Sequence, residues 1–338
     1  LVQQVGSVSF PISGGVAHQG KSYIEGLQSL QEAKKRFFEN DKDVNADSIT
    51  EAETGFYARI TNQEIELRNK ALKELGEKPN LELALFGEVE SSKAKDKAAQ
   101  DKVASLKLEL SNLRKISASL SELRPFVWSI EFAEVFISKG GFDVVIGNPP
   151  YVRQEKIEDP YGKVSASEYK KLLKDMCVLD FPESFKRNGV SSRSDLYVYF
   201  YIRSLRLLNE SGVHVFICSN SWLDVEYGAR LQEFMLRDYR LLSIIDNHAR
   251  RSFSAAAVNT VISIISSRAT PERNPSRFVG FKKPFEEVTF SEVLSKVFME
   301  KNSFADDSSR VVVVGEQGLL SDSESDGDDG IFLHAGGQ

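Results

Sequence analysis

A short apolar run that ends in a glycine and two prolines constrains this chain more than any other feature. Residues Phe142–Gly147 read Phe-Asp-Val-Val-Ile-Gly, which predicts a buried β-strand, and Asn-Pro-Pro-Tyr follows at residues 148–151. Proline lacks the backbone N–H that a central strand needs, so we expect the strand to end there. The loop therefore presents an amide and an aromatic ring at the carboxyl end of a strand, where open α/β sheets bind their ligands.

Strand and helix patterns alternate after this loop. We predict strands at residues 213–218, 241–245 and 258–265, helices at residues 195–208 and 228–239, and a turn at residues 209–212. This order predicts an α/β fold with half of a mostly parallel sheet, closed by an antiparallel hairpin. A half-sheet indicates that partner strands lie outside this chain.

The region before the loop has a helical pattern with charged surfaces. Apolar residues at alternating three-and-four spacing in residues 99–120, together with residues 60–75, predict a helical hairpin or short antiparallel coiled coil. Such a stripe is more often packing than a partner-binding site. With Pro125 as a boundary, we predict a helical insertion with an irregular start at residues 1–124, a catalytic half-domain at 125–270, and a linker leading into a following region at 271–338.

Composition and charge exclude several classes of protein. The net charge of −6 argues weakly against wholesale coating of nucleic acid, and no apolar stretch reaches the roughly 18–20 residues of a membrane span. The first 20 residues do not resemble a secretory signal. Cys177 and Cys218 cannot form a disulfide framework and lack the spacing of a metal site, so we expect them to fill space in a cytoplasmic protein without a bound metal.

The residue types of the loop suggest chemistry on an amino group attached to a heteroaromatic ring. Such an amine is a poor nucleophile, and two hydrogen-bond acceptors favour its nucleophilic form. The Asn148 side-chain oxygen and the Pro149 carbonyl are such acceptors, and the two prolines hold the backbone rigidly. Tyr151 offers a face for stacking an extruded base. Positioning and electrostatics suffice for this reaction, without a metal or a covalent intermediate.

Longer runs around the loop resemble the catalytic core of adenine-specific DNA methyltransferases. Residues 126–132 (Phe-Val-Trp-Ser-Ile-Glu-Phe) and 140–152 carry most of the resemblance. It continues through residues 195–200 (Asp-Leu-Tyr-Val-Tyr-Phe), 213–223 and 253–262, so it covers roughly residues 125–267. The chain is most similar to the type IIG restriction-modification and phage-defence branch of these enzymes.

The resemblance implies a role for each matching residue. Asn148 and Pro149 would hold the adenine amino group toward the methyl group of S-adenosyl-L-methionine, with Pro150 shaping the loop. Tyr151 would stack on the flipped adenine, and double-stranded DNA would be the partner. Phe253 matches a looser aromatic position that packs against the base in relatives, although an ordinary core aromatic beside a strand explains it equally well.

One departure from the family pattern is serious. The glycine-rich cofactor motif, of the Asp-Pro-Ala-Cys-Gly-Ser-Gly type, should precede the catalytic loop, and nothing in residues 1–147 matches it. We therefore expect an internal fragment, inactive alone, whose cofactor-binding and target-recognition parts lie elsewhere in one polypeptide. Asp195 stands where a helix begins, and we expect a simple N-cap there rather than a cofactor contact.

Three alternatives remain open at the level of sequence. The same loop serves enzymes that methylate RNA or a glutamine amide in proteins, although those are generally compact and lack a helical insertion. Cytosine amino methylation is chemically possible, but relatives of that type usually carry serine where Asn148 stands. A scaffold without catalysis, with a helical hairpin that recruits a partner, belongs to a different class.

Overall fold

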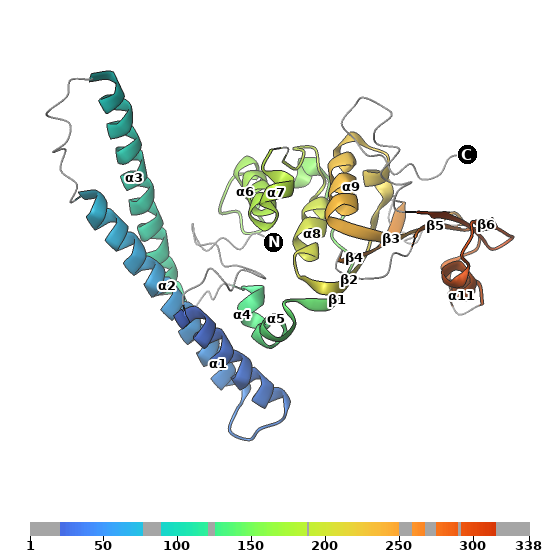
Figure 1. The fold of residues 1–338 in the computed structure, drawn as a ribbon, viewed down its shortest axis with the longest axis horizontal. Coiled ribbons are helices and arrows are strands. Elements are labelled where there is room, and N and C mark those ends of the chain that lie inside the picture. The colour runs from blue at the N-terminus through green and yellow to red at the C-terminus, as the bar shows by residue number, and fades with distance from the viewer. Residues whose placement is uncertain are drawn as a thin grey trace. The chain divides into compact units, whose positions relative to one another are not determined.

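The computed structural model describes residues 21–76, 89–120, 126–187, 189–249, 259–267, 275–289 and 292–315. The chain forms two compact units, a helical one and an α/β one, that divide between Ser138 and Lys139 (Figure 1). We describe each unit by itself. In the residues so described, no helix combines the length and the hydropathy that a membrane crossing requires.

The helical unit contains the predicted hairpin. Helices α2 (Ala46–Gly76) and α3 (Val89–Ser119) are its two long arms, and α1 (Lys21–Phe38) packs against α2. The short helices α4 (Trp128–Glu131) and α5 (Ala133–Lys139) lead to the boundary between the units. The buried core collects side chains from these helices, namely Leu27, Leu30, Phe56, Tyr57, Ile60, Leu113, Leu120, Val127, Ile130 and Ala133. Of the apolar stripe in residues 99–120, Leu110, Leu113 and Leu120 are buried, whereas the residues before Leu110 are half-buried or exposed.

Buried polar contacts also hold the helical unit together. Lys34 lies 2.5 Å from Glu53, and both side chains are almost completely buried. The Lys34 ammonium also donates to the carbonyl of Glu131. The Tyr57 hydroxyl accepts a hydrogen bond from the Val127 N–H at 2.9 Å and donates to Glu131 Oε1 at 3.2 Å. A buried ion pair of this kind is costly to break because a lone charge would remain inside.

The α/β unit is built on one sheet with the order β1-β2-β4-β3-β5-β7-β6. Its strands are β1 (Phe142–Gly147), β2 (Leu208–Ser219), β3 (Tyr239–Asn247), β4 (Thr260–Ser267), β5 (Ser276–Phe281), β6 (Phe304–Ala305) and β7 (Ser309–Val314). Within the described residues, β4 and β7 run opposite to the other strands. The prediction of an α/β sheet with an antiparallel hairpin is confirmed: five of the seven described strands run in one direction, β3 and β4 form the hairpin, and β4 lies between β2 and β3. In its pairings the described sheet is mixed, since only β1–β2 and β3–β5 pair in parallel.

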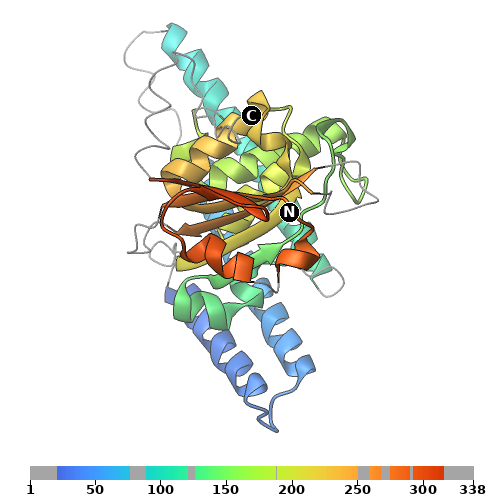
Figure 2. The ribbon, with the colours of Figure 1, turned by 90° about the vertical axis from the view of Figure 1, so that its right-hand side faces the viewer.

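Helices pack on both faces of this sheet. One face carries α6 (Ala166–Asp180), α7 (Pro182–Phe185), α8 (Leu196–Leu205) and α9 (Glu226–Asp238). The opposite face, at the end formed by β3, β5 and β7, carries α10 (Phe285–Val288) and α11 (Glu292–Met299). Adjacent residues on one strand serve both cores, since Ile244 faces the first and Ile245 the second. Figure 2 shows the strands β5 and β7 toward the viewer, with α11 beside them.

Two stretches differ from the sequence expectation. Residues 209–212, predicted as a turn, lie within β2, because Leu208 already pairs with Phe142 and the pairing then jumps from Leu208 to Val213. The polar residues therefore form an irregularity inside the strand. Residues 276–314, which lie in the range assigned to a linker and a following region, contribute β5, β6 and β7 to the same sheet. The domain boundaries themselves stay predictions.

Candidate active site

The Asn-Pro-Pro-Tyr loop leaves the carboxyl end of β1, as predicted. Gly147 pairs with Phe216 on β2, and a Cβ atom at Gly147 would lie only 2.9 Å from Phe216 Cε1. The strand therefore needs glycine at its last position. Beyond it Asn148 is exposed and Pro149 is buried. The loop thus presents the amide to solvent while its backbone is anchored by the first proline.

Tyr151 ties the loop to the neighbouring strand. Its ring packs against the core between the sheet and α6–α9, and its hydroxyl donates to the carbonyl of Ile217 on β2 at 3.3 Å. Burial, with a smaller contribution from nearby Cys218, raises the pKa of Tyr151 to about 12. The phenol is therefore neutral at physiological pH, and the ring is held at a defined place beside β2.

Two backbone contacts fasten the segment that follows Tyr151 to the start of α8. The N–H of Leu196 donates to the carbonyl of Val152 at 3.0 Å. The N–H of Gln154 donates to Asp195 Oδ1 at 2.9 Å. On the other side of the segment, Lys170 of α6 donates to the side-chain oxygen of Gln154 at 3.3 Å. Val152 is thus held by Leu196, and Gln154 is held by both Asp195 and Lys170.

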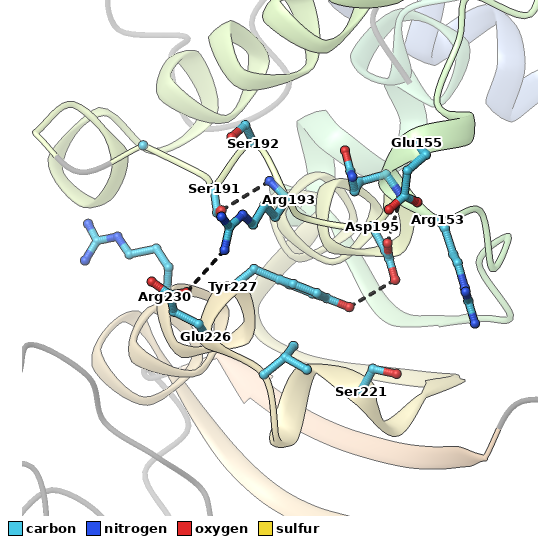
Figure 3. A pocket seen from close by; sticks show the side chains of 13 residues that line it. Arg153, Glu155, Ser191, Ser192, Arg193, Asp195, Ser221, Glu226, Tyr227 and Arg230 are labelled. Atoms are coloured by element: carbon cyan, nitrogen blue, oxygen red, sulfur yellow. Dashed lines mark hydrogen bonds and ion pairs between the residues drawn. The ribbon is translucent and has the colours of Figure 1, made fainter.

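Asp195 does not act as the side-chain cap that the sequence suggested. It occupies the N-cap position of α8, but its carboxylate makes no capping hydrogen bond to that helix. The second oxygen, Oδ2, instead accepts from the Tyr227 hydroxyl of α9 at 3.0 Å, and the Tyr197 hydroxyl lies 3.0 Å from that of Tyr227. Figure 3 shows Tyr227 and Asp195 pointing toward one another. The carboxylate is used for tertiary contacts rather than for its own helix.

A cavity of about 960 Å³ lies beside this carboxylate, between three segments of the α/β unit. It is lined by Arg153, Gln154, Glu155, Gly189, Ser191, Ser192, Arg193, Asp195, Ser221, Val225, Glu226, Tyr227 and Arg230 (Figure 3). Arginines and acidic residues are equally numerous in this lining, and Arg193 lies 3.7 Å from Glu226. The wall is polar rather than cationic, so charge alone does not mark it as a phosphate site.

The structure gathers most of the predicted site at one edge of the sheet. Because β1 and β2 are parallel, residues 148–151 and residues 219–220 leave the sheet at the same edge. Phe253 lies outside the described residues, so its role stays a prediction, as do the roles of the loop residues. Sequence reasoning missed Tyr227, because nothing in the sequence around it signals a contact with a residue more than 30 positions away.

Comparison with known proteins gives a consistent picture. Residues 38–253 match the Eco57I restriction-modification methylase family. The chain is similar to the type II methyltransferase M.BstVI of Geobacillus stearothermophilus, with 32% identity over 171 residues, which are 50% of this chain and 26% of that protein. It is also similar to the type II methyltransferase M.PaeR7I of Pseudomonas aeruginosa, with 32% identity over 108 residues, or 32% of this chain and 16% of that protein.

Among solved structures, the type IIG restriction endonuclease BpuSI is a remote neighbour. It has 13% sequence identity and a TM-score of 0.42, and the match covers 64% of this chain and 28% of that one. The chain therefore spans only about a quarter or less of the length of the two methyltransferases. It spans a similar share of BpuSI.

Proposed function

This chain belongs to the Eco57I restriction-modification methylase family, and from that premise we propose that it supplies the target-amine half of an adenine-specific DNA methyltransferase site. The observation that carries the proposal is the Asn-Pro-Pro-Tyr loop at the carboxyl end of β1, with Asn148 exposed and Pro149 buried. Family membership supports methyl transfer, and the loop supports an amino group as its acceptor.

The loop's own groups would activate and orient the amine. The Asn148 side-chain oxygen and the Pro149 carbonyl would each accept a hydrogen bond from the amino group of a flipped-out adenine. Both hydrogens would then be held away from the incoming methyl group, which leaves the nitrogen lone pair free to attack. When bound, S-adenosyl-L-methionine would supply the methyl group: the carbon–nitrogen bond would form as the methyl–sulfur bond breaks, the electron pair would stay on sulfur as a thioether, and the surplus proton of the amine would pass to water. Fixed acceptors of this kind lower the barrier because they need no reorganisation during the reaction.

Tyr151 would support the extruded base. Its ring is already fixed by the hydroxyl contact with Ile217 and by the core beneath it. Stacking on an aromatic ring of this kind contributes about 1–3 kcal/mol per base. Since its phenol remains neutral at physiological pH, the ring adds no charge near the reacting amine.

We further propose that residues outside this chain hold most of the cofactor. No glycine-rich cofactor motif occurs in residues 1–147. In the described part of the chain, β1 is an edge strand, and its outward side chains Val144 and Ile146 are 58% and 77% exposed. Further strands beside β1, and helices over these side chains, would bury them and complete the sheet. On this basis the isolated 338-residue chain is inactive, and methyl transfer by it would refute this part of the proposal.

The test is to identify the methylated product. The native polypeptide that contains these residues is incubated with methyl-labelled S-adenosyl-L-methionine and, in separate reactions, with double-stranded DNA, RNA or protein. The methylated nucleosides and amino acids are then identified by mass spectrometry. We expect the label on the exocyclic nitrogen of adenine. Label on cytosine would refute adenine specificity, label in RNA or on a protein glutamine would support the other amine substrates, and no label in any of them would favour the scaffold.

A further inference from the structure

We infer that Asp195 is a positioning residue for the Asn-Pro-Pro-Tyr loop: its carboxylate fixes the backbone immediately after Tyr151 and joins it to α8 and α9. The inference rests on the proposed function, since the position of the loop matters for catalysis only if residues 148–151 hold the substrate. Asp195 would contact neither the base nor the cofactor, and its effect would pass through the loop.

The Asp195 carboxylate does not cap its own helix. An aspartate at an N-cap position ordinarily accepts a hydrogen bond from its own helix, a contact worth about 0.5–2 kcal/mol. Asp195 stands at that position of α8 and makes no such bond. Both of its oxygens are instead directed to other segments, Oδ1 to Gln154 and Oδ2 to Tyr227. Because the usual capping hydrogen bond is missing, we infer that these tertiary contacts set the orientation of the Asp195 side chain.

The Asp195 contact falls on the backbone just after the Asn-Pro-Pro-Tyr loop. Pro149 and Pro150 restrict the first half of the loop by their own rings. The second half lacks such rings. The Leu196–Val152 and Gln154–Asp195 hydrogen bonds, at 3.0 and 2.9 Å, tie its backbone to the start of α8. These two bonds lie within three residues of Tyr151. Loss of the second would loosen the backbone that follows Tyr151, while the ring keeps its own contacts with Ile217 and the core.

The Asp195 carboxylate is itself held in place by two tyrosine hydroxyls. The Tyr227 hydroxyl donates to Oδ2, and the Tyr197 hydroxyl lies within hydrogen-bond distance of Tyr227. Tyr197 is 1% exposed and belongs to the main core, so this chain of hydroxyls anchors Asp195 to the interior. Hydrogen bonds to a charged carboxylate are roughly twice as strong as those between neutral groups. Hydrogen bonds from Gln154 through Asp195 and Tyr227 to Tyr197 therefore connect the end of the loop to the core.

The substitutions that test this role differ in what they retain. Asp195→Ala removes both acceptors. Asp195→Asn keeps an oxygen for the Gln154 N–H and exchanges the other contact for an amide, which can donate to the Tyr227 oxygen. Tyr227→Phe keeps the ring and removes only the hydroxyl that orients the carboxylate. The hydrogen bonds of Asp195 with Gln154 and Tyr227 together form a clamp on the loop. Asn148→Ala is the matched control, because it removes the proposed catalytic amide and leaves this clamp intact.

Hydrogen exchange on the native polypeptide tests the clamp without reference to activity. We expect peptides that contain the Gln154 amide to exchange at least about tenfold faster in Asp195→Ala. The change should be smaller in Tyr227→Phe and slight in Asp195→Asn and Asn148→Ala. Peptides from β3 and β4 serve as the internal reference for global stability. Unchanged exchange at Gln154 in both Asp195→Ala and Tyr227→Phe would overturn the clamp.

Kinetics then test whether the clamp matters for methyl transfer. A misplacement of about 1 Å near a reacting group can lower the rate by about 100-fold, so we expect a fall of that order in kcat for Asp195→Ala. The Kd for DNA and the KM for S-adenosyl-L-methionine should stay within about twofold, and Asp195→Asn should recover kcat to within about tenfold of wild type. A purely structural residue would not separate kcat from KM in this way.

The outcomes separate this inference from the proposed function. If the wild-type polypeptide methylates DNA and Asn148→Ala does not, the proposed function stands, and an unchanged kcat in Asp195→Ala overturns the positioning role alone. If the wild-type polypeptide methylates nothing, the proposed function fails, while hydrogen exchange still decides the clamp. If Asp195→Ala does not fold, Tyr227→Phe decides: exchange at Gln154 and kcat both unchanged from wild type would overturn the inference.

Discussion

Replacing Gly147 with alanine tests how closely the strand controls the loop. The new methyl group would lie 2.9 Å from Phe216 Cε1, and 3.5 and 3.6 Å from two further ring carbons. Carbon atoms prefer about 3.5–4.0 Å, so the ring or the strand has to move by roughly 0.5–1 Å. Phe216 is 5% exposed, and its ring centroid lies 4.1 Å from that of His214 and 5.1 Å from that of Tyr201. The ring has little room, so we expect β1 to give way.

Two consequences follow from that movement. Overpacking of a filled core costs about 1–3 kcal/mol, which denaturant unfolding of Gly147→Ala should detect. Asn148 is the next residue, so the same shift should lower the rate of methyl transfer by about 100-fold at saturating substrate. Gly55→Ala is the matched control, because Gly55 lies in α2 with nothing within 4 Å of the added methyl group. That change should raise stability by up to about 1 kcal/mol.

A second-site change checks the cause. Phe216→Leu removes the ring atom nearest to the new methyl group, so the double variant Gly147→Ala/Phe216→Leu should recover much of kcat even if the core stays weakened. The reasoning is refuted if Gly147→Ala matches wild type in both unfolding free energy and kcat. It is equally refuted if the double variant is no faster than Gly147→Ala.

Three further predictions concern the core and the base-stacking ring. Lys34→Met removes the ammonium from the buried carboxylate of Glu53 and should lower the free energy of unfolding in urea by about 3–5 kcal/mol. The double variant Lys34→Met/Glu53→Leu should recover most of this loss, and equal stability of the two variants would contradict the prediction. Burial lowers the pKa of His214 to about 3, so the stability that comes from keeping this imidazole neutral is full above the unfolded pKa of about 6.5 and is lost as the pH falls toward 3. His214→Phe should remove this loss, which is on the order of 4 kcal/mol, from the plot of unfolding free energy against pH. An unaltered pH profile would argue against it. Tyr151→Phe should keep single-turnover methyl transfer within about threefold of wild type, while Tyr151→Ala should lose about 10–100-fold through lost stacking, and similar rates for both would contradict a stacking role.

Local pattern was enough to predict β1 to β4, whereas β5, β6 and β7 lie in the range predicted as a linker and a following region. The strand at Phe142–Gly147 was predicted with the bounds that the structure has, because an apolar run and two prolines leave few alternatives. The helix at residues 228–239 appears as α9 and the hairpin arms as α2 and α3. The order of strands was beyond reach, since the insertion of β4 between β2 and β3 depends on pairing between distant segments.

Around the loop, too, local features could be predicted from the sequence and tertiary contacts could not. The loop's place at a strand end followed from residue types alone, and so did the burial of Cys177 and Cys218. The partners of Asp195 did not, because an aspartate before a helix is explained locally by capping, and only tertiary structure brings Tyr227 to it. The sequence therefore predicted that the Asn-Pro-Pro-Tyr loop follows a strand, and the structure was needed to see which contacts hold the loop there.

The account depends most directly on Asn148, and one comparison tests it. Wild-type native polypeptide and its Asn148→Ala variant are compared for methyl transfer to double-stranded DNA and for DNA binding under the same conditions. We expect a fall in transfer of at least about 100–1000-fold with the Kd for DNA changed by less than about threefold, because the amide acts on the amine rather than on the duplex. Transfer at the wild-type rate by Asn148→Ala would contradict the central claim.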